Sequence, residues 1–275
     1  MPTEEEEKML QEVLRVAGEA DAPALAVGAN ARFLVLDERY GLPLRRLTQD
    51  WDFAVRLESW QGYQKLAAAL TQDGAFLRTD PHRFVHSGTK IPIDLIPLGE
   101  LAGAEKRIEW PETGRSMNVL GFDEAFQHAE EVELAGERIM VATPPWHVAL
   151  KLFAYSDRAA ERDLADIEFI LENATEVLSE RVFDELSSEL ADGHLQYDET
   201  GPYLLACDLR RQSSTMVIAG LLDVLSGLLD EADHLSLRRH LLGNVIEKIR
   251  RRSWMGLCAA LRLSGEGCGS QSTEA

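Results

Sequence analysis

The sequence predicts a mixed α/β domain of the α+β class, followed by a helical domain. Short apolar runs bounded by turn residues fill the first half of the chain and favour strands joined by helices. After Pro144-Pro145, apolar residues recur at helical spacing as far as a Gly/Ser-rich tail. We therefore expect an α/β domain over residues 1–142, a helical domain over residues 143–263 and a flexible tail over residues 264–275.

The elements of the first domain follow from caps and periodicity. Thr3 and Glu6 are spaced as a capping box, and the helix that they begin should reach about Ala17 and end with Gly18 as its C-terminal cap. Apolar runs and alternation predict strands, and 3.6-residue spacing predicts helices. The expected strands cover residues 24–27, 50–57, 75–77, 83–86 and 90–97, the expected helices cover residues 29–39 and 60–70, and a hairpin is expected over residues 132–141 around Ala135-Gly136.

The second domain should be almost entirely helical. Helical spacing covers residues 146–156 and 159–172 and then continues from residue 174 to about residue 263. Glycine weakens a helix interior, so we expect breaks in this last stretch. The glycines at which the breaks are expected are Gly193, Gly201 and Gly243.

The charge of the chain excludes a generally basic nucleic-acid binder. It carries 28 Lys and Arg against 47 Asp and Glu, a net charge of −19, whereas binding to phosphates needs positive charge. One basic cluster, residues 248–252, runs against this trend. It is either a solvated face near a helix C-terminus, where the helix dipole favours cations, or a docking surface for an RNA backbone or an acidic partner.

Three observations favour a cytoplasmic protein that does not enter a membrane. The three cysteines are widely spaced and form no CxxC pair, so a disulfide scaffold and a zinc ribbon are both unfavoured. The acidic N-terminus is the opposite of a basic signal-peptide start. No uninterrupted apolar run reaches the roughly 18–20 residues that span a bilayer.

Two aspartates two residues apart are the first candidate site residues. On a strand, Asp50 and Asp52 would point to the same face, with Cα atoms roughly 6–7 Å apart. Two adjacent carboxylates repel unless a positive charge lies between them, and a hard cation such as Mg²⁺ or Mn²⁺ prefers oxygen ligands. The alternative is a solvated turn or strand edge, which accounts for most isolated Asp-x-Asp patterns.

A third aspartate, Asp94, lies inside the apolar run Ile91–Ile96. A buried carboxylate without a partner is destabilising, so Asp94 needs one. It is either a hydrogen-bonded core or strand-edge residue, or it joins Asp50 and Asp52 at a cation on neighbouring strands. Three carboxylates on neighbouring strands make a metal site more credible than either pattern alone.

The segment Val27-Gly28-Ala29-Asn30-Ala31-Arg32 joins a strand to a helix. Glycine at such a junction permits close approach of a phosphate, and the free N–H groups of the helix start can bind it. The alternative interpretation is an ordinary turn.

These residues together resemble a known superfamily. Gly28-Ala29, the pattern Thr48-x-Asp50-x-Asp52 and the later Asp94 are similar to the nucleotidyltransferases of the polymerase-beta-like fold. A second signature resembles one family of that group, AbiEii, which supplies the toxin of type IV toxin–antitoxin systems. It consists of Lys151, Arg158, Arg162, Asp163 and Asp166 at their spacing on two helices, and the whole resemblance covers roughly residues 24–172.

The resemblance implies a core sheet with flanking helices and transfer of a nucleotidyl group from an NTP, such as ATP, to an acceptor. The implied catalytic and metal residues are Asp50, Asp52 and Asp94, with Asp94 completing a second metal site or acting as general base on the acceptor. The implied partners are an NTP, a cognate antitoxin and an acceptor that is RNA (tRNA among them), protein or a small molecule. The implied nucleotide-binding residues are Gly28, Ala29, Asn30, Arg32, Thr48, Lys151, Arg158 and Asp163.

One position departs from the superfamily pattern. Ala29 stands where Ser or Gly is usual, so the hydroxyl contact to the triphosphate must be replaced by backbone N–H groups, Asn30 or Arg32. Two alternative functions stay open. The acidic composition favours a nucleotidyltransferase that acts on a cationic, antibiotic-like small molecule, and the departure at Ala29 favours a non-catalytic interaction protein that keeps the fold.

Overall fold

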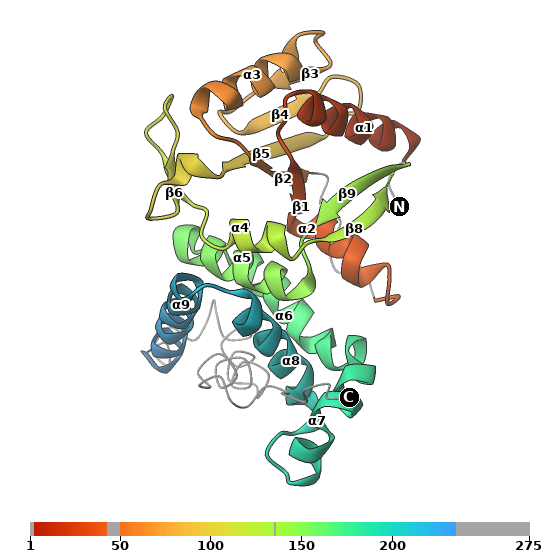
Figure 1. Cartoon of the computed structure of the whole chain (residues 1–275), viewed down its shortest axis with the longest axis vertical. Coiled ribbons are helices and arrows are strands. Elements are labelled where there is room, and N and C mark those ends of the chain that lie inside the picture. The colour runs from red at the N-terminus through yellow and green to blue at the C-terminus, as the bar shows by residue number, and fades with distance from the viewer. Residues whose placement is uncertain (1–2, 43–49, 135, 235–275) are drawn as a thin grey trace, which may run out of the picture. The chain divides into compact units, whose positions relative to one another are not determined.

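The chain divides into two compact units, Met1–Thr143 and Pro144–Ala275, in a computed structural model (Figure 1). The structure describes residues 3–42, 50–134 and 136–234. The first unit mixes strands and helices, whereas the described part of the second unit is helical. The predicted mixed α+β fold is thereby confirmed.

A seven-stranded sheet forms the centre of the described part of the first unit, in the order β3-β4-β5-β2-β1-β9-β8. Every strand expected from the sequence is present, with ends that differ by at most two residues, because apolar runs identify strands better than they fix their ends. The strands are β1 (Ala24–Val27), β2 (Trp51–Arg56), β3 (Phe76–Arg78), β4 (Arg83–His86), β5 (Pro92–Leu98), β8 (Glu130–Leu134) and β9 (Glu137–Val141).

The central strands carry the core of this unit. β2 runs parallel to β5 and antiparallel to β1, and β1 runs parallel to β9. Trp51, Phe53 and Val55 are buried, as their alternation predicts, but Ala54 between them is buried as well. A strand that is covered on both faces has few places for polar side chains, so the aspartates at its start stand apart from the rest of the strand.

Helix α1 (Glu4–Glu19) begins with the predicted capping box, in which Thr3 and Glu6 bond to each other's backbone N–H. Its predicted end at Gly18 is wrong. The helix continues past Gly18, and Asp21 takes the left-handed conformation with φ of 51°. The bonds Asp21 N–H to Gly18 O and Ala22 N–H to Ala17 O then close the helix as a Schellman motif.

Two further helices of the first unit match expectation. The predicted helix over residues 29–39 is present as α2 (Gly28–Arg32), which continues directly as a π-helical turn, η1 (Phe33–Asp37). Helix α3 (Trp60–Thr71) is capped by the hydroxyl of Ser59 and packs beside α1.

A stretch between β5 and β8 contains elements that the sequence did not predict. They are η2 (Glu100–Ala102), the two-stranded sheet of β6 (Arg107–Glu109) and β7 (Ser116–Asn118), and helix α4 (Phe122–Gln127). Three-residue strands are too short to show a period. Tertiary packing holds them, since Trp110 beside β6 is 2% exposed and its ring contacts those of Trp60 and Tyr63.

The second unit is a set of helices, as predicted. They are α5 (Pro144–Arg158), α6 (Glu161–Val177), α7 (Ser179–Ala191), α8 (Tyr197–Gln212) and α9 (Thr215–His234). None of the helices in the described ranges has the length and apolar character needed to cross a membrane. Gly193 lies in the turn between α7 and α8, which confirms that break. Gly243 lies outside the described residues.

The break predicted at Gly201 is wrong, because this glycine lies within α8 against the backbone of α6. A Cβ atom there would lie 2.1 Å from the backbone nitrogen of Thr175. The Thr175 hydroxyl accepts from the N–H of Gly201 at 3.1 Å. It also lies 3.5 Å from the carbonyl of Asp198, whose usual helical partner would be the N–H of residue 202, which Pro202 lacks. The Gly-Pro pair is therefore used for close helix packing rather than for a turn.

The close approach at Gly201 makes a direct prediction. Gly201→Ala should lower the stability of the protein by roughly 1–3 kcal/mol, because the added methyl group must push two helices apart. Thermal unfolding followed by circular dichroism measures the loss. Gly227→Ala is the control, because nothing lies within 4 Å of a Cβ at that helical glycine. It should raise the midpoint slightly, and equal losses in the two variants would contradict the packing account.

Candidate active site

The three aspartates singled out in the sequence meet on one face of the sheet. Asp52 on β2 and Asp94 on β5 are direct register partners, so their Cα atoms lie about 4.8 Å apart and their side chains point to the same side. Asp50 directly precedes β2. The carboxylates of Asp50 and Asp94 lie 3.5 and 2.7 Å from the same nitrogen atom of Arg83, so the structure brings all three acids together.

Gly28 at the end of β1 leaves the space in which the Asp52 carboxylate lies. Val27, the residue before it, is the register partner of Asp52, and the backbone at Gly28 has φ of +79°. A Cβ atom on Gly28 would lie 2.1 Å from Oδ2 of Asp52. Glycine is therefore required twice here, once for its backbone conformation and once for its missing side chain.

Arg83 is a site residue that the sequence did not reveal. It begins β4 and is the register partner of Asp94. Its Nε and Nη2 atoms donate to the two carboxylate oxygens of Asp94, both at 2.7 Å. The pKa of Arg83 is raised, chiefly by this hydrogen bonding, with smaller contributions from the charges of Asp94, Asp50 and Asp52. Only the strand register could have identified it.

The residues expected around the phosphates have different surroundings. The side chain of Asn30 donates to the backbone carbonyl of Asp50 at 2.8 Å, and it thereby holds the segment that carries the first carboxylate. Arg32 is 4% exposed and pairs with the buried Asp37 at 3.0 Å, which favours a structural role over nucleotide binding. Thr48 and the basic cluster of residues 248–252 lie outside the described residues.

Two of the three aspartates, Asp50 and Asp52, are placed so that they could hold a hard cation such as Mg²⁺. The side chain of Asp50 is 34% exposed and Asp52 is half-buried, so two carboxylate groups line an accessible position. Asp94 is 12% exposed, and both its oxygens already accept from Arg83. In the described part of the chain, no group of three or more His, Cys, Asp or Glu side chains is arranged to hold a metal ion. Asp50 and Asp52 are thus the two aspartates that fit.

The second signature forms an ion cluster between α5 and α6. The Lys151 ammonium lies 3.2 Å from Asp163 and 2.8 Å from Asp166, and Arg158 donates twice to Asp163, at 2.7 and 2.6 Å. Burial raises the pKa of the fully buried Asp163, but the hydrogen bonds from Arg158 and the charge of Lys151 outweigh it and lower the pKa overall. Asp163 therefore holds the side chains of both Lys151 and Arg158 in place.

A groove at the other end of β2 is separate from the carboxylates. It lies in the first unit, has a volume of about 1390 Å³ and is lined by Arg56, Gly99, Lys106 and Asp123 among others. Lys106 and Arg56 lie 2.8 and 3.8 Å from Asp123. Since Asp52 and Arg56 are four residues apart on β2, the groove begins about 13 Å from Asp52 along the strand.

The contact between Gly28 and Asp52 leads to a stability prediction. Gly28→Ala must strain a left-handed backbone and also displace the Asp52 carboxylate. Gly74→Ala is the matched control, because φ at Gly74 is +71° but nothing lies within 4 Å of its Cβ position. Both variants should be destabilised by the strain, and Gly28→Ala by roughly 1–3 kcal/mol more. Chemical denaturation measures the difference, and equal losses would show that Asp52 does not occupy this space.

Two solved structures match this chain in a structure comparison. JHP933 from Helicobacter pylori has a similar structure, with 15% sequence identity over 92% of this chain and 91% of the other and a TM-score of 0.36. ANT(2'')-Ia in complex with adenylyl-2''-tobramycin has 13% identity over 64% of this chain and 92% of the other, also with a TM-score of 0.36. No curated protein sequence matches the chain.

A family comparison covers most of the sequence. The model of the family described as "Nucleotidyl transferase AbiEii toxin, Type IV TA system" matches residues 35–254. This range includes the three aspartates, Arg83 and the ion cluster of α5 and α6. The chain therefore belongs to the AbiEii family of nucleotidyltransferases.

Proposed function

We propose that this protein transfers a nucleotidyl group from an NTP to a hydroxyl or phosphate of an acceptor and that the transfer requires Mg²⁺ or Mn²⁺. Membership of the AbiEii family supports nucleotidyl transfer. The observation that carries the finer proposal is the convergence of Asp50, Asp52 and Asp94 beside Gly28, at the accessible start of β2.

The cation would be held by Asp50 and Asp52. When bound, it would neutralise the triphosphate and stabilise the charge that develops on the leaving pyrophosphate. Asn30 contributes by fixing the backbone of Asp50. Gly28 contributes by leaving room for the Asp52 carboxylate, and the backbone N–H groups of Gly28 and Ala29 are proposed as donors for a phosphate. The missing hydroxyl at Ala29 is compatible with this use of the backbone.

Lys151 and Arg158 are proposed as cations for the phosphates or the acceptor. The Lys151 side chain is 17% exposed and the Arg158 side chain is 41% exposed, and Asp163 fixes the position of both. A lysine acts as a point charge and an arginine as a planar fork, and both bind phosphate oxygens. A cognate antitoxin is proposed as the protein partner, on the ground of the family alone.

A label-transfer experiment tests the reaction class. The full chain is incubated with each of the four NTPs and Mg²⁺, in separate arms with total RNA, with a cell lysate and with a panel of cationic antibiotics. Label on the α-phosphate should pass to one acceptor class, whereas label on the γ-phosphate should not, because nucleotidyl transfer releases pyrophosphate. Transfer of the γ-label would show a kinase instead.

Variants identify the residues that act. Asp52→Asn should lower the rate of transfer roughly 100-fold or more, the scale of losing one preorganised charge contact. Asp73→Asn is the matched control, since Asp73 is an exposed carboxylate in the turn after α3. EDTA should abolish transfer and added Mn²⁺ should restore it. Equal rates in the wild type and in Asp52→Asn would contradict the proposed site.

A further inference from the structure

The candidate site contains one guanidinium among three carboxylates. Asp50, Asp52 and Asp94 carry three negative charges on one face of the sheet, and Arg83 lies within 4 Å of two of them. The hydrogen bonds to Asp94 are parallel, charge-assisted and short, which is the strongest geometry available to this pair of side chains. Asp94 thus has a permanent cation as its partner.

The position of Arg83 is fixed by its own backbone. Its carbonyl accepts from Thr79 at 2.9 Å and from Asp80 at 3.3 Å, and its N–H donates to Asp80 at 3.1 Å. The N–H of Leu95, next to Asp94, bonds to the carbonyl of His82 at 2.8 Å. The start of β4 is therefore tied to β5 at the register that brings the guanidinium to the carboxylate.

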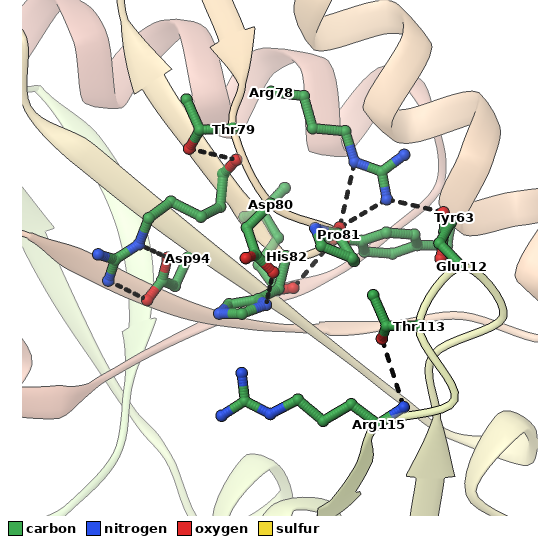
Figure 2. A network of polar contacts seen from close by, with 12 residues as sticks. Tyr63, Arg78, Thr79, Asp80, Pro81, His82, Asp94, Glu112, Thr113 and Arg115 are labelled. Carbon is green, nitrogen blue, oxygen red and sulfur yellow. Dashed lines mark hydrogen bonds and ion pairs between the residues drawn. The ribbon is translucent and has the colours of Figure 1, made fainter.

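A second network holds the turn before Arg83 (Figure 2). Arg78 donates twice to the carbonyl of Pro81, at 3.2 and 2.7 Å, and forms an ion pair with Glu112 at 3.0 Å. The buried hydroxyl of Tyr63 lies 2.9 Å from the same carbonyl. Burial raises the pKa of Tyr63, so this hydroxyl stays a donor. These contacts hold the turn from both sides, so the backbone from which the Arg83 side chain reaches Asp94 is well supported.

We propose that Arg83 is a positioning residue that supplies a fixed positive charge to Asp94, so that the cation site of this protein is formed by Asp50 and Asp52 and excludes Asp94. This inference rests on the proposed function. A cation that used Asp94 as a ligand would have to replace two short hydrogen bonds and leave Arg83 beside it. The repulsion between the two positive charges opposes that exchange. Asp52, next to Asp94 in the register, is relieved of part of the carboxylate repulsion by the same guanidinium.

Titration of the full chain with Mn²⁺ alone, with free Mn²⁺ measured by electron paramagnetic resonance, tests the assignment. The wild type should bind one ion. Asp52→Asn should weaken binding roughly 10–100-fold, as expected for loss of a ligand or its close support, whereas Asp94→Asn should stay within about threefold of the wild type. Asp73→Asn serves again as the exposed control. A loss in Asp94→Asn as large as in Asp52→Asn would overturn the proposal.

Replacement of Arg83 should increase Mn²⁺ binding, which a purely structural role of Arg83 would not produce. Arg83→Met should tighten Mn²⁺ binding or add a second ion, because Asp94 then becomes available, and the further change Asp94→Asn should remove the gain. Arg83→Lys keeps the charge and should bind as the wild type does. Unchanged binding in Arg83→Met would contradict the account.

A thermal double-mutant cycle in EDTA separates this inference from the proposed function. The melting temperatures of Arg83→Met, Asp94→Asn and the double variant are compared with that of the wild type. The double variant should lose no more than the larger single loss, since each change already breaks the pair. Additive losses would overturn the pairing. If the wild type does not bind Mn²⁺, both the metal requirement of the proposed function and the cation site of Asp50 and Asp52 are contradicted. The double-mutant cycle would still decide whether Arg83 and Asp94 form a pair.

Discussion

Charge balance at the start of β2 and β5 is the constraint on which the candidate site depends. The register places Asp52 directly beside Asp94, and Asp50 lies close enough to share a nitrogen of Arg83 with Asp94. Without compensation, three neighbouring carboxylates would repel one another. One guanidinium is bonded to Asp94 and lies near Asp50, and we propose that Asp50 and Asp52 together hold a divalent cation. The need for positive charge thus connects the strand register with the proposed chemistry.

The surrounding structure serves that arrangement at several points. Gly28 gives room to the Asp52 carboxylate, Asn30 holds the backbone of Asp50, and the turn before β4 holds Arg83. In the second unit, Asp163 plays a comparable part, because a single buried carboxylate fixes both Lys151 and Arg158. In both units, a side chain that carries charge is oriented by a partner that is itself held by buried neighbours.

Much of this could be predicted from the sequence, and the rest depends on tertiary contacts. Apolar runs identified the seven sheet strands, and the isolated Asp94 in one of them already required a partner. Arg83 could not be named, because an antiparallel register joins it to Asp94 across eleven residues. The helix end predicted at Gly18 and the break predicted at Gly201 are both wrong. Asp21, not Gly18, takes the left-handed conformation that closes α1, and Gly201 allows close packing of α8 on α6. The strands around Trp110 are held by ring contacts that a local pattern does not show.

The most direct test of the central claim is the location of the cation. Crystals of the full chain grown with Mn²⁺ and a non-hydrolysable ATP analogue would be examined for anomalous scattering at the manganese absorption edge. The account predicts one peak bridged by the carboxylates of Asp50 and Asp52 and the triphosphate, with Arg83 still bonded to Asp94. A peak coordinated by Asp94, or nucleotide bound away from these aspartates, would contradict it.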